Sequence, residues 1–404
     1  MSDERDATIE VLSSLGEIDA AAWDRNANPN PTTYNPFVSH AFLKALEDAE
    51  CVRPGVGWQP QHLILTGAGG EIEGCMPLYA KSHSKGEYVF DYGWADAYEN
   101  AGGHYYPKLL SGVPFTPVPG PRLLVGDGPR QSARRSFLAA GATELVKRSR
   151  LSSFHLNFLT ETEWNEMSEL GFLRRTDQQF HWCNDGYQSF DDFLASLTSR
   201  KRKTIRKERS EALVRGLTIE LLTASDIEER HWDAMYAFYM DTGSRKWGRP
   251  YLNRAFFSLL GEAMAERCLL ILVRSGREYI AGALNMIGGD CLYGRYWGAL
   301  EHHPCLHFEV CYYQAIEYAI NKGLARVEAG AQGEHKLARG YMPTPTYSAH
   351  WIPNPSFRRA VANYLEDERR YVERARAHLA NFGPYRKDRA ATAATDMPVD
   401  EDND

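Results

Sequence analysis

The sequence contains little that would tie the protein to a membrane or to an oxidising compartment. Its seven cysteines are an odd number and form no C-x-x-C pair, which favours buried thiols over a disulfide framework. No apolar run approaches the ~18 residues of a membrane span, and the start of the chain lacks the basic and apolar regions of a secretory signal. We therefore expect a cytoplasmic protein with no membrane span.

Positive charge is not in excess. The formal net charge is -7, with 46 lysines and arginines against 53 aspartates and glutamates. This balance excludes a protein whose whole surface binds nucleic acid or anionic lipid, and we expect no DNA partner. Any contact with a polyanion has to come from a local basic patch.

Several common catalytic motifs are missing. The chain has no G-x-S-x-G elbow, Walker A loop or dinucleotide fingerprint, so hydrolase, NTPase and dinucleotide-binding functions lose their usual support. The acyl-CoA loop of ordinary acetyltransferases, Arg/Gln-x-x-Gly-x-Gly/Ala before a helix, is absent too. "LEHHPCL" stands in its place before "HFEVCYYQAI", and it offers few flexible backbone N–H groups to a pyrophosphate.

The segment "EHHPCLHFEVC" (301–311) gathers histidines and cysteines but contains no C-x-x-C pair. We predict no metal site there, because a loop that leads into a helix explains the segment better. His307 and Glu309 of this helix are expected to face a pocket, since the helix begins where a central sheet would splay.

The composition is that of an ordinary globular protein. With 43% apolar and 25% charged residues, the chain of 404 residues can bury a large core, and its length favours two or three domains. Apolar periodicity predicts helices over 131–150, 189–216 and 356–380. Short β-type runs predict strands at "QHLILTG", "EIEGCMPLYAKSH" and "GEYVFDYGW".

A weak internal repeat is visible. "LILTGAGGEIEGCMPLY" (63–79) and "LILVRSGREYIAGALNM" (270–286) both read as a strand, a turn and a second strand that begins with Glu and then Gly. The segments that follow, "DYGWADAYENAGGHYYPKLL" and "GRYWGALEHHPCLHFEVCYYQAI", are also similar. The repeat indicates a duplicated unit in which each copy is a small α+β domain.

Four ionisable residues follow the strand-like segment "ARVEAG" near the end of the chain. Glu334, His335, Lys336 and Arg339 stand in "GAQGEHKLARGY", between glycines that let the backbone approach a substrate. In acyl transfer to an amine, a fixed cation stabilises the carbonyl oxygen, and a carboxylate or imidazole assists loss of the amine proton. The motif predicts a catalytic site at the mouth of the strand; a surface loop with solvated charges is the alternative.

A basic run, "RKRKTIRKER" (200–209), interrupts the acidic chain with seven basic residues and one acidic residue. At helical spacing it has two stripes. The basic stripe holds Arg202, Arg206 and Arg209, and the apolar stripe holds Leu197, Ile205 and Ala212. The basic stripe is predicted to point outward, where it is either solvated or in contact with a nucleotide pyrophosphate or an RNA backbone.

Together these segments resemble the FemAB-like branch of the GNAT superfamily, and more narrowly its peptidoglycan biosynthesis/recognition group of predicted N-acyltransferases. The resemblance spans about residues 35 to 380 and is most specific in "GAQGEHKLARGY". It implies an α+β fold with mixed sheets and two tandem GNAT-like domains. The expected parts are a leader over 1–34, a first domain over 35–185, a second over 186–353, a C-terminal helix packed on the core over 354–384, and a disordered acidic tail over 385–404.

The resemblance implies a transferase that moves an acyl or aminoacyl group from an activated donor to a small-molecule or peptide amine, with no tightly bound cofactor. FemAB transferases use aminoacyl-tRNA, which implies a tRNA contact at the basic helix over 200–209, whereas the wider superfamily uses acyl-CoA. The Phe-Lys pair of the FemAB pattern corresponds here to His335-Lys336. Lys336 matches the lysine of the pattern, whereas His335 stands where the pattern has phenylalanine. A non-catalytic recognition module for a peptide or cell-wall precursor is the alternative function.

We expect the following roles. Lys336 stabilises the developing oxyanion or binds a donor phosphate, and Glu334 or His335 relays the proton. Arg339, Arg202 and Arg206 hold anionic groups. The further binding candidates are Tyr296, His307 and Glu328. The aromatic residues Tyr293, Tyr296, Trp297, Tyr341 and Trp351 either line the site or belong to the core.

Overall fold

The computed structural model describes residues 7–213, 216–246, 250–330 and 333–386, without the side chains of residues 244–246 and 334. Of the predicted acidic tail over 385–404, all but two residues lie outside the described ranges. We call residues 7–183 the first half and residues 184–351 the second half. No helix within the described ranges is long and apolar enough to cross a lipid bilayer.

The first half contains five α-helices among its described elements, in addition to short 3-10 turns. Its strands are β1 (Thr8–Leu12), β2 (Trp58–Pro60), β3 (His62–Thr66), β4 (Ile72–Met76), β5 (Tyr79–Lys81), β6 (Lys108–Ser111), β7 (Phe154–Leu159) and β8 (Leu173–Cys183). Its helices are α1 (Ala20–Ala27), α2 (His40–Asp48), α3 (Tyr92–Asn100), α4 (Gln131–Ser149) and α5 (Glu161–Glu169).

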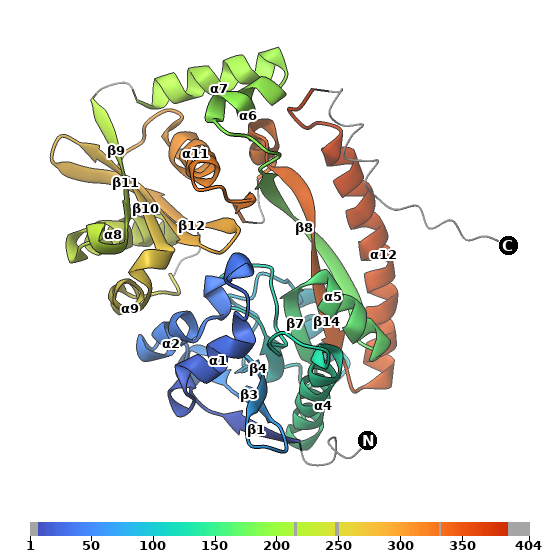
Figure 1. The fold of residues 1–404 in the computed structure, drawn as a ribbon. Coiled ribbons are helices and arrows are strands. Elements are labelled where there is room, and N and C mark those ends of the chain that lie inside the picture. The colour runs from blue at the N-terminus through green and yellow to red at the C-terminus, as the bar shows by residue number, and fades with distance from the viewer. Residues whose placement is uncertain (1–6, 214–215, 247–249, 331–332, 387–404) are drawn as a thin grey trace.

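The second half follows with a larger antiparallel part. Its strands are β9 (Leu217–Thr223), β10 (Cys268–Ser275), β11 (Glu278–Ile287), β12 (Cys291–Ala299), β13 (Arg326–Glu328) and β14 (Met342–Trp351). Its helices are α6 (Phe190–Ser196), α7 (Ser199–Ala212), α8 (Glu229–Lys246), α9 (Arg254–Met264), α10 (Leu306–Phe308), the π-helix η7 (Glu309–Tyr313), α11 (Gln314–Asn321) and the 3-10 helix η8 (Glu334–Arg339). The helix α12 (Pro355–Ala380) comes last and lies alongside β8 and β14 (Figure 1).

One large sheet joins the two halves. Its eleven strands have the order β2-β5-β6-β7-β14-β8-β13-β12-β11-β10-β9, and a separate three-stranded sheet has the order β1-β3-β4. The last strand of each half pairs with the penultimate strand of the other: β14 pairs with β7, and β8 pairs with β13. β8 and β14 pair with each other at the centre. The predicted α+β class with mixed sheets is confirmed, while the division at residue 185 stays a prediction.

The repeated hairpins have the predicted form. β3 pairs antiparallel with β4, with Leu63 opposite Met76, and β10 pairs antiparallel with β11, with Leu270 opposite Leu284. The second part of the predicted repeat is wrong. The predicted strand "GEYVFDYGW" is absent from the described elements and its last residues belong to the helix α3 (Tyr92–Asn100), whereas the segment compared with it in the repeat begins in the strand β12. Similar aromatic and glycine content does not fix the backbone conformation.

The long helix predicted over 189–216 is divided in two. α6 ends at Ser196, and Leu197 takes an extended conformation that pairs with Tyr385. The backbone N–H of Thr198 then donates to the carbonyl of Pro384 at 2.9 Å. The helix therefore breaks at Leu197, where a distant segment supplies the backbone hydrogen bonds. The apolar periodicity of residues 189–216 does not predict this break.

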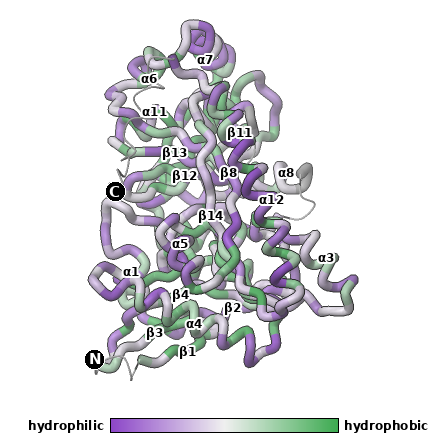
Figure 2. Tube along the Cα trace, turned by 90° about the vertical axis from the view of Figure 1, so that its right-hand side faces the viewer, coloured by the Kyte–Doolittle hydropathy of each residue, from purple (hydrophilic) through white to green (hydrophobic). Residues whose placement is uncertain are grey.

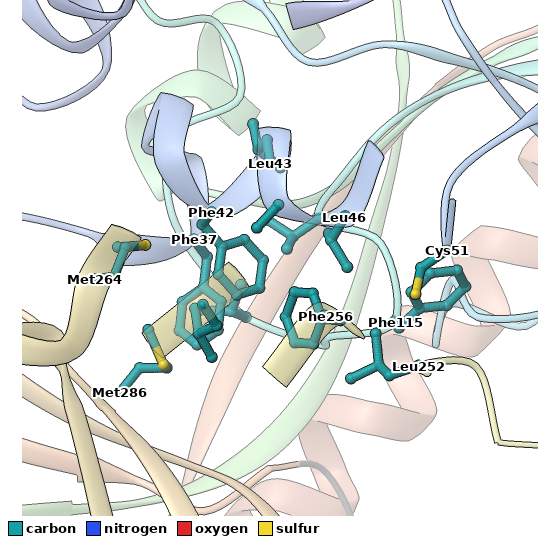
Figure 3. Close-up of a cluster of buried hydrophobic side chains, with 14 of the residues drawn as sticks. Phe37, Phe42, Leu43, Leu46, Cys51, Phe115, Leu252, Phe256, Met264 and Met286 are labelled. Carbon is teal, nitrogen blue, oxygen red and sulfur yellow. The ribbon is translucent and has the colours of Figure 1, made fainter. Parts of the chain in front are cut away.

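A hydrophobic core connects the halves. Figure 3 shows Phe37, Phe42, Leu43 and Leu46 of the first half packed against Leu252, Phe256, Met264 and Met286 of the second. Phe42 and Phe256 meet edge to face with ring centres 6.0 Å apart. Their burial supplies the main non-directional attraction between the halves.

Candidate active site

A cavity of about 610 Å³ opens where the parallel pair β12 and β13 ends. The two strands pair from Cys291 with Arg326 to Tyr293 with Glu328. Beyond this point β12 continues alongside β11, and the chain after β13 turns into the segment that contains η8. The second-half wall of the cavity consists of Tyr239, Tyr251, Asn285, Arg295, Tyr296, Trp297, His307, Cys311, Tyr312, His335, Lys336 and several smaller residues.

The first half closes the cavity from the other side with Tyr88, Phe115 and Pro117. Tyr88 and Phe115 both have φ near the left-handed region, at 60° and 61°. Bulky side chains rarely adopt this conformation, and such strain concentrates at functional sites. Phe115 stacks on Tyr251 with ring centres 4.8 Å apart and an interplanar angle of 12°. The cavity is thus built by both halves.

Lys336 lies in the wall of this cavity and is only 4% exposed. Its Nζ donates to the carbonyls of Ala329 at 2.5 Å and Gly330 at 3.0 Å. Gly333 and Gly340 bound η8 with φ of 114° and 94°, values that a glycine adopts with little strain. The motif therefore folds into a tight turn that brings the ammonium group back over the end of β13.

His335 and His307 face the same cavity and are joined by Tyr312. The Tyr312 hydroxyl lies 2.9 Å from Nε2 of His335 and 3.3 Å from Nε2 of His307. Burial raises the pKa of Tyr312, so its hydroxyl keeps its proton. Tyr312 belongs to the π-helix η7, and such irregular turns are frequent at functional sites. Sequence reasoning missed it because the π-turn shifts it off the helical period.

Arg295 is a second residue that sequence reasoning missed. Leu284 pairs with Tyr296 and Asn285 pairs with Gly294, so Arg295 is the extra residue of a β-bulge. Bulges redirect side chains and recur beside active sites. The Arg295 side chain is 3% exposed, and its Nη2 lies 3.8 Å from Glu328 Oε2. Burial lowers the pKa of Arg295, and Glu328 is the leading influence that opposes this shift.

Glu328 lies behind the cavity wall instead of in it. Its Oε1 accepts from Nε of Arg326 at 3.3 Å, and Arg326 in turn pairs with Asp290. Glu328 is 2% exposed. Glu328 therefore neutralises the half-buried guanidinium group of Arg326 and the buried one of Arg295, which lines the cavity.

Arg339 also lies behind the wall. Its Nη2 donates to Glu208 Oε1 at 2.7 Å, its Nη1 donates to the carbonyl of His335 at 2.7 Å, and its guanidinium group lies 3.4 Å from the ring centre of Phe308. These contacts tie η8 to α7 and α10. A protein carboxylate already occupies the position that a bound anion would take.

The described lining of the cavity includes no residue of the basic helix α7, although α7 packs behind it through Glu208 and Arg339. Arg206 is exposed and pairs with Asp191 at 3.1 Å, and Arg202 is half-buried in the first turns of α7. Figure 2 shows α7 largely in the hydrophilic colour. The apolar stripe is confirmed: its members Leu197, Ile205 and Ala212 are buried.

The predicted outward direction is wrong for Arg209. Its Nη2 donates to Glu309 at 3.0 Å and to Glu317 at 2.7 Å, and the Glu309 side chain is completely buried. The buried carboxylate of the facing helix draws the guanidinium group inward. Glu309, expected to face a pocket, is engaged in this ion pair.

The predicted residues thus separate into three groups. Lys336, His335, His307 and Tyr296 meet in the cavity wall, whereas Glu328 and Arg339 support the wall from behind. Arg202 and Arg206 lie apart on α7. Glu334 begins η8, but its side chain lies outside the described atoms. Of the aromatic candidates, Tyr296 and Trp297 line the cavity, while Tyr293 and Tyr341 are core residues.

A carboxylate lies near the start of α10, which follows the segment "LEHHPCL". Cys305 precedes α10 with φ of 60°, its Sγ lies 3.6 Å from Glu211 Oε2, and Glu309 occupies the next turn. The partial positive charge of a helix start attracts carboxylates as it attracts phosphates. In the described part of the chain, no three His, Cys, Asp or Glu side chains are placed to hold a metal ion.

Comparisons with known proteins extend these observations. No curated protein matches the chain. Among solved structures, FemX has a TM-score of 0.53 at 13% identity and covers 88% of this chain and 100% of its own. The C-terminal domain of a putative lysylphosphatidylglycerol synthetase from Agrobacterium fabrum has a TM-score of 0.53 at 9% identity, over 86% and 96% of the two chains.

A tandem GNAT protein from the clavulanic acid biosynthesis pathway has a TM-score of 0.46 at 11% identity, over 87% of this chain and 99% of its own. The likeness to FemX, at so low an identity, shows a shared fold alone, and the expected FemAB-like architecture is confirmed. The sequence pattern of the FemAB-like family, described as peptidoglycan biosynthesis/recognition, matches residues 14–387. The chain therefore belongs to the FemAB-like family.

Proposed function

We propose that this protein is an N-acyltransferase that moves an acyl or aminoacyl group from an activated donor to an amine acceptor inside the cavity at the end of β12 and β13. Membership of the FemAB-like family points to transferase activity. The single observation that carries the proposal is the buried Lys336 ammonium group in the wall of a cavity that also contains two imidazoles.

The roles follow from where charge changes during the reaction. As the amine attacks, negative charge develops on the acyl oxygen, and a fixed cation in a water-poor wall stabilises it more strongly than it would in water. In this proposal Lys336, which lines the cavity, supplies that charge. The amine must also lose a proton, for which His335 and Glu334 are the candidates. In this proposal Arg339 positions η8 instead of holding a ligand.

The donor follows from two features of the second half. Cys305, which precedes α10, contacts Glu211 at 3.6 Å, and Pro304 supplies no backbone N–H, so this position is poorly suited to the pyrophosphate of acyl-CoA. The exposed cations of α7 are suited to an RNA backbone. We therefore favour aminoacyl-tRNA over acyl-CoA, and a peptidoglycan-precursor amine as the acceptor.

Incubation of the pure protein with labelled acetyl-CoA and, separately, with charged tRNA tests the proposal. Each reaction contains an amine acceptor mixture that includes a cell-wall peptide. Transfer from charged tRNA and not from acetyl-CoA is the expected result. Transfer from acetyl-CoA alone would reverse the choice of donor, and no product from either would remove the enzymatic function.

A recognition module is the second candidate, because the family description covers recognition as well as biosynthesis. Such a protein would use the same cavity but no proton relay. A double substitution of Glu334→Gln and His335→Gln separates the two. If the protein is a recognition module, the double variant keeps the affinity of the wild type for a cell-wall peptide, and neither protein forms a product. If the protein is a transferase, the double variant loses the turnover that the wild type shows.

A further inference from the structure

Exposed aromatic side chains gather on one surface of the molecule, formed by α12 and the segment around the start of α3. Within the described ranges, six tyrosine and phenylalanine side chains are exposed. Five of them belong to this surface and have exposed fractions between 48% and 68%: Phe90, Tyr92, Tyr364, Tyr371 and Phe382. The sixth, Phe137, lies on α4. An exposed apolar patch of this kind commonly marks an interaction site.

A groove of about 820 Å³ lies between α3 and the first turns of α12. Its walls include Ala97 and Tyr98 of α3 on one side and Ala360, Val361 and Tyr364 of α12 on the other. Figure 2, in which α12 faces the viewer, shows α3 beside it. Among the described residues, no charged side chain lines the groove, so it is suited to an apolar side chain.

The exposed aromatic residues of α12 form a stripe that continues from this groove. At 3.6 residues per turn, Tyr364, Tyr371 and Phe382 lie within about 20° of one another around the helix axis. Phe382 follows the end of α12 but continues its turn, because its backbone N–H donates to the carbonyl of Leu379 at 3.0 Å. The buried Leu365 marks a different face, the one that packs on the core.

Two copies of α12 placed antiparallel on this stripe would match each other. A helix rises about 1.5 Å per residue, so with Tyr371 on the two-fold axis, Phe382 of one copy and Ala360 of the other both lie ~16 Å from the axis at the same level. The exposed Phe382 of each copy would then enter the groove of the other. Tyr364 would come level with His378, whose ring centre lies 4.9 Å from that of Phe382.

The charges beside the stripe fit the same arrangement. Asp367 lies one helical turn before Tyr371 and Arg374 lies about one turn after it, both on the same side of the stripe. In the antiparallel pair Asp367 of one copy is level with Arg374 of the other, and the two-fold axis repeats this opposite-charge contact. A parallel pair would place like charges at one level. The Asp367 side chain is 82% exposed, so a second copy can reach it.

We infer that α12 and the groove beside α3 form a symmetric, antiparallel interface with a second copy of this chain, into which each copy inserts Phe382. The inference goes beyond the proposed function and does not depend on it. Among the described residues, none of α12 lines the cavity of the candidate active site, so each copy keeps its own site.

The mass of the full-length protein in solution, measured by light scattering over a range of concentrations, tests the interface. We expect twice the mass of one chain. Tyr371→Glu places two carboxylates at the axis and should weaken the dimer by about 30-fold or more, the range for a residue at the centre of an interface. Phe137→Glu, at the exposed aromatic residue of α4, is the matched control. A monomeric wild type, or equal dissociation constants in the two variants, would overturn the inference.

Cysteine cross-linking tests the orientation, because only position 371 meets itself across the axis. Under mild oxidation, Tyr371→Cys is expected to form a disulfide between copies and Tyr364→Cys is not. A mixture of Tyr364→Cys with His378→Cys should form a mixed disulfide. The wild type gives the background of the native cysteines. No cross-link in Tyr371→Cys, or an equal yield in Tyr364→Cys alone, would overturn the antiparallel arrangement.

Charge reversal gives a further readout. Asp367→Arg should weaken the dimer about tenfold, and addition of Arg374→Asp to the same chain should restore it, because the opposite charges are then exchanged. A double variant weaker than Asp367→Arg would contradict the contact between Asp367 and Arg374. Sedimentation with phosphatidylglycerol vesicles tests a rival occupant. A wild type that stays monomeric and sediments with the vesicles would assign the stripe to a membrane surface and overturn the inference.

Discussion

A lysine and two histidines lie near each parallel strand pair, but among the described residues only those near β12 and β13 line the cavity. In the first half, β6 and β7 pair in parallel from Leu109 with Phe154 to Ser111 with Leu156. The Lys108 side chain there is fully buried and donates to Glu87 at 2.8 Å and to Asp91. In the second half, the parallel pair of β12 and β13 ends at the cavity that Lys336 lines.

The histidines differ in the same way. His155 and His350 of the first network lie with their Nδ1 atoms 2.7 Å apart and are both completely enclosed. Burial lowers the pKa of His155 to about 3. Burial alone would raise the pKa of Asp91, but Lys108 and His155 outweigh it and hold that pKa well below its usual range. The comparison teaches that residue types do not define a site: the same side chains are a sealed ion-pair network in one half and the wall of a cavity in the other.

The largest expected effect is on the sealed network. Lys108→Met would leave Asp91 and Glu87 buried without their cation, and we expect a loss of about 3–5 kcal/mol in the free energy of unfolding, measured in denaturant. Lys44→Met is the matched control, because Lys44 pairs with Asp48 on the exposed surface of α2 at 2.7 Å. Equal losses in the two variants would break the comparison.

The second prediction concerns the cavity. Lys336→Ala should lower turnover by about 100 to 1,000-fold, the range for loss of one preorganised oxyanion stabiliser. Two backbone carbonyls lose a donor, so we expect a smaller loss of stability, about 1–3 kcal/mol, than in Lys108→Met. Lys322→Ala, at an exposed lysine after α11, serves as the control. Retained turnover in a folded Lys336→Ala protein would discard the catalytic role of this residue.

The third prediction uses the low pKa of His155. The unfolded chain binds a proton at this residue below about pH 6.5, whereas the folded protein does so only near pH 3. Stability should therefore fall as the pH is lowered from 6.5 toward 3, with His155 contributing up to about 1.4 kcal/mol per pH unit. Denaturant unfolding at several pH values in His155→Gln should give a slope shallower by about one proton. An unchanged slope would mean that His155 titrates normally in the folded state.

The smallest effect on stability is expected on α7. Arg206→Ala removes an exposed ion pair with Asp191 and should change the free energy of unfolding by about 0.5 kcal/mol or less. If α7 contacts RNA, the same variant should reduce the slope of log affinity for tRNA against log salt by about one. Arg230→Ala, at an exposed arginine paired with Glu228, is the control. A salt slope that is the same in both variants would remove α7 from the RNA contact.

Local features of the fold could be predicted from the sequence because they depend on neighbouring residues. The helix predicted over 131–150 is α4, the helix over 356–380 is α12, and the repeated hairpins are β3/β4 and β10/β11. Pairing between distant segments could not be predicted. The exchange of β8 and β14, and the break at Leu197 where Tyr385 pairs, depend on hydrogen bonds to residues far along the chain.

For the site, the motif around Lys336 predicted where the cavity opens, because glycines and charges at a strand end are visible in the sequence. Arg295 and Tyr312 could not be found in the same way. The position of Arg295 depends on a β-bulge and that of Tyr312 on a π-turn, and both shift a residue off the regular period. Arg339 and Arg209 have the charge of ligand-binding residues, but each forms an ion pair with a carboxylate of the protein itself.

The last strand of each half pairs with a strand of the other half, and this has a consequence for any protein that contains only one half. β8 of the first half pairs with β13 of the second, and β14 of the second half pairs with β7 of the first. A polypeptide truncated to one half would therefore lack the strand that the other half contributes to its sheet. The last strand of that polypeptide would also have lost its partner in the other half. Neither half alone would keep a complete sheet beside the cavity, which residues of both halves line.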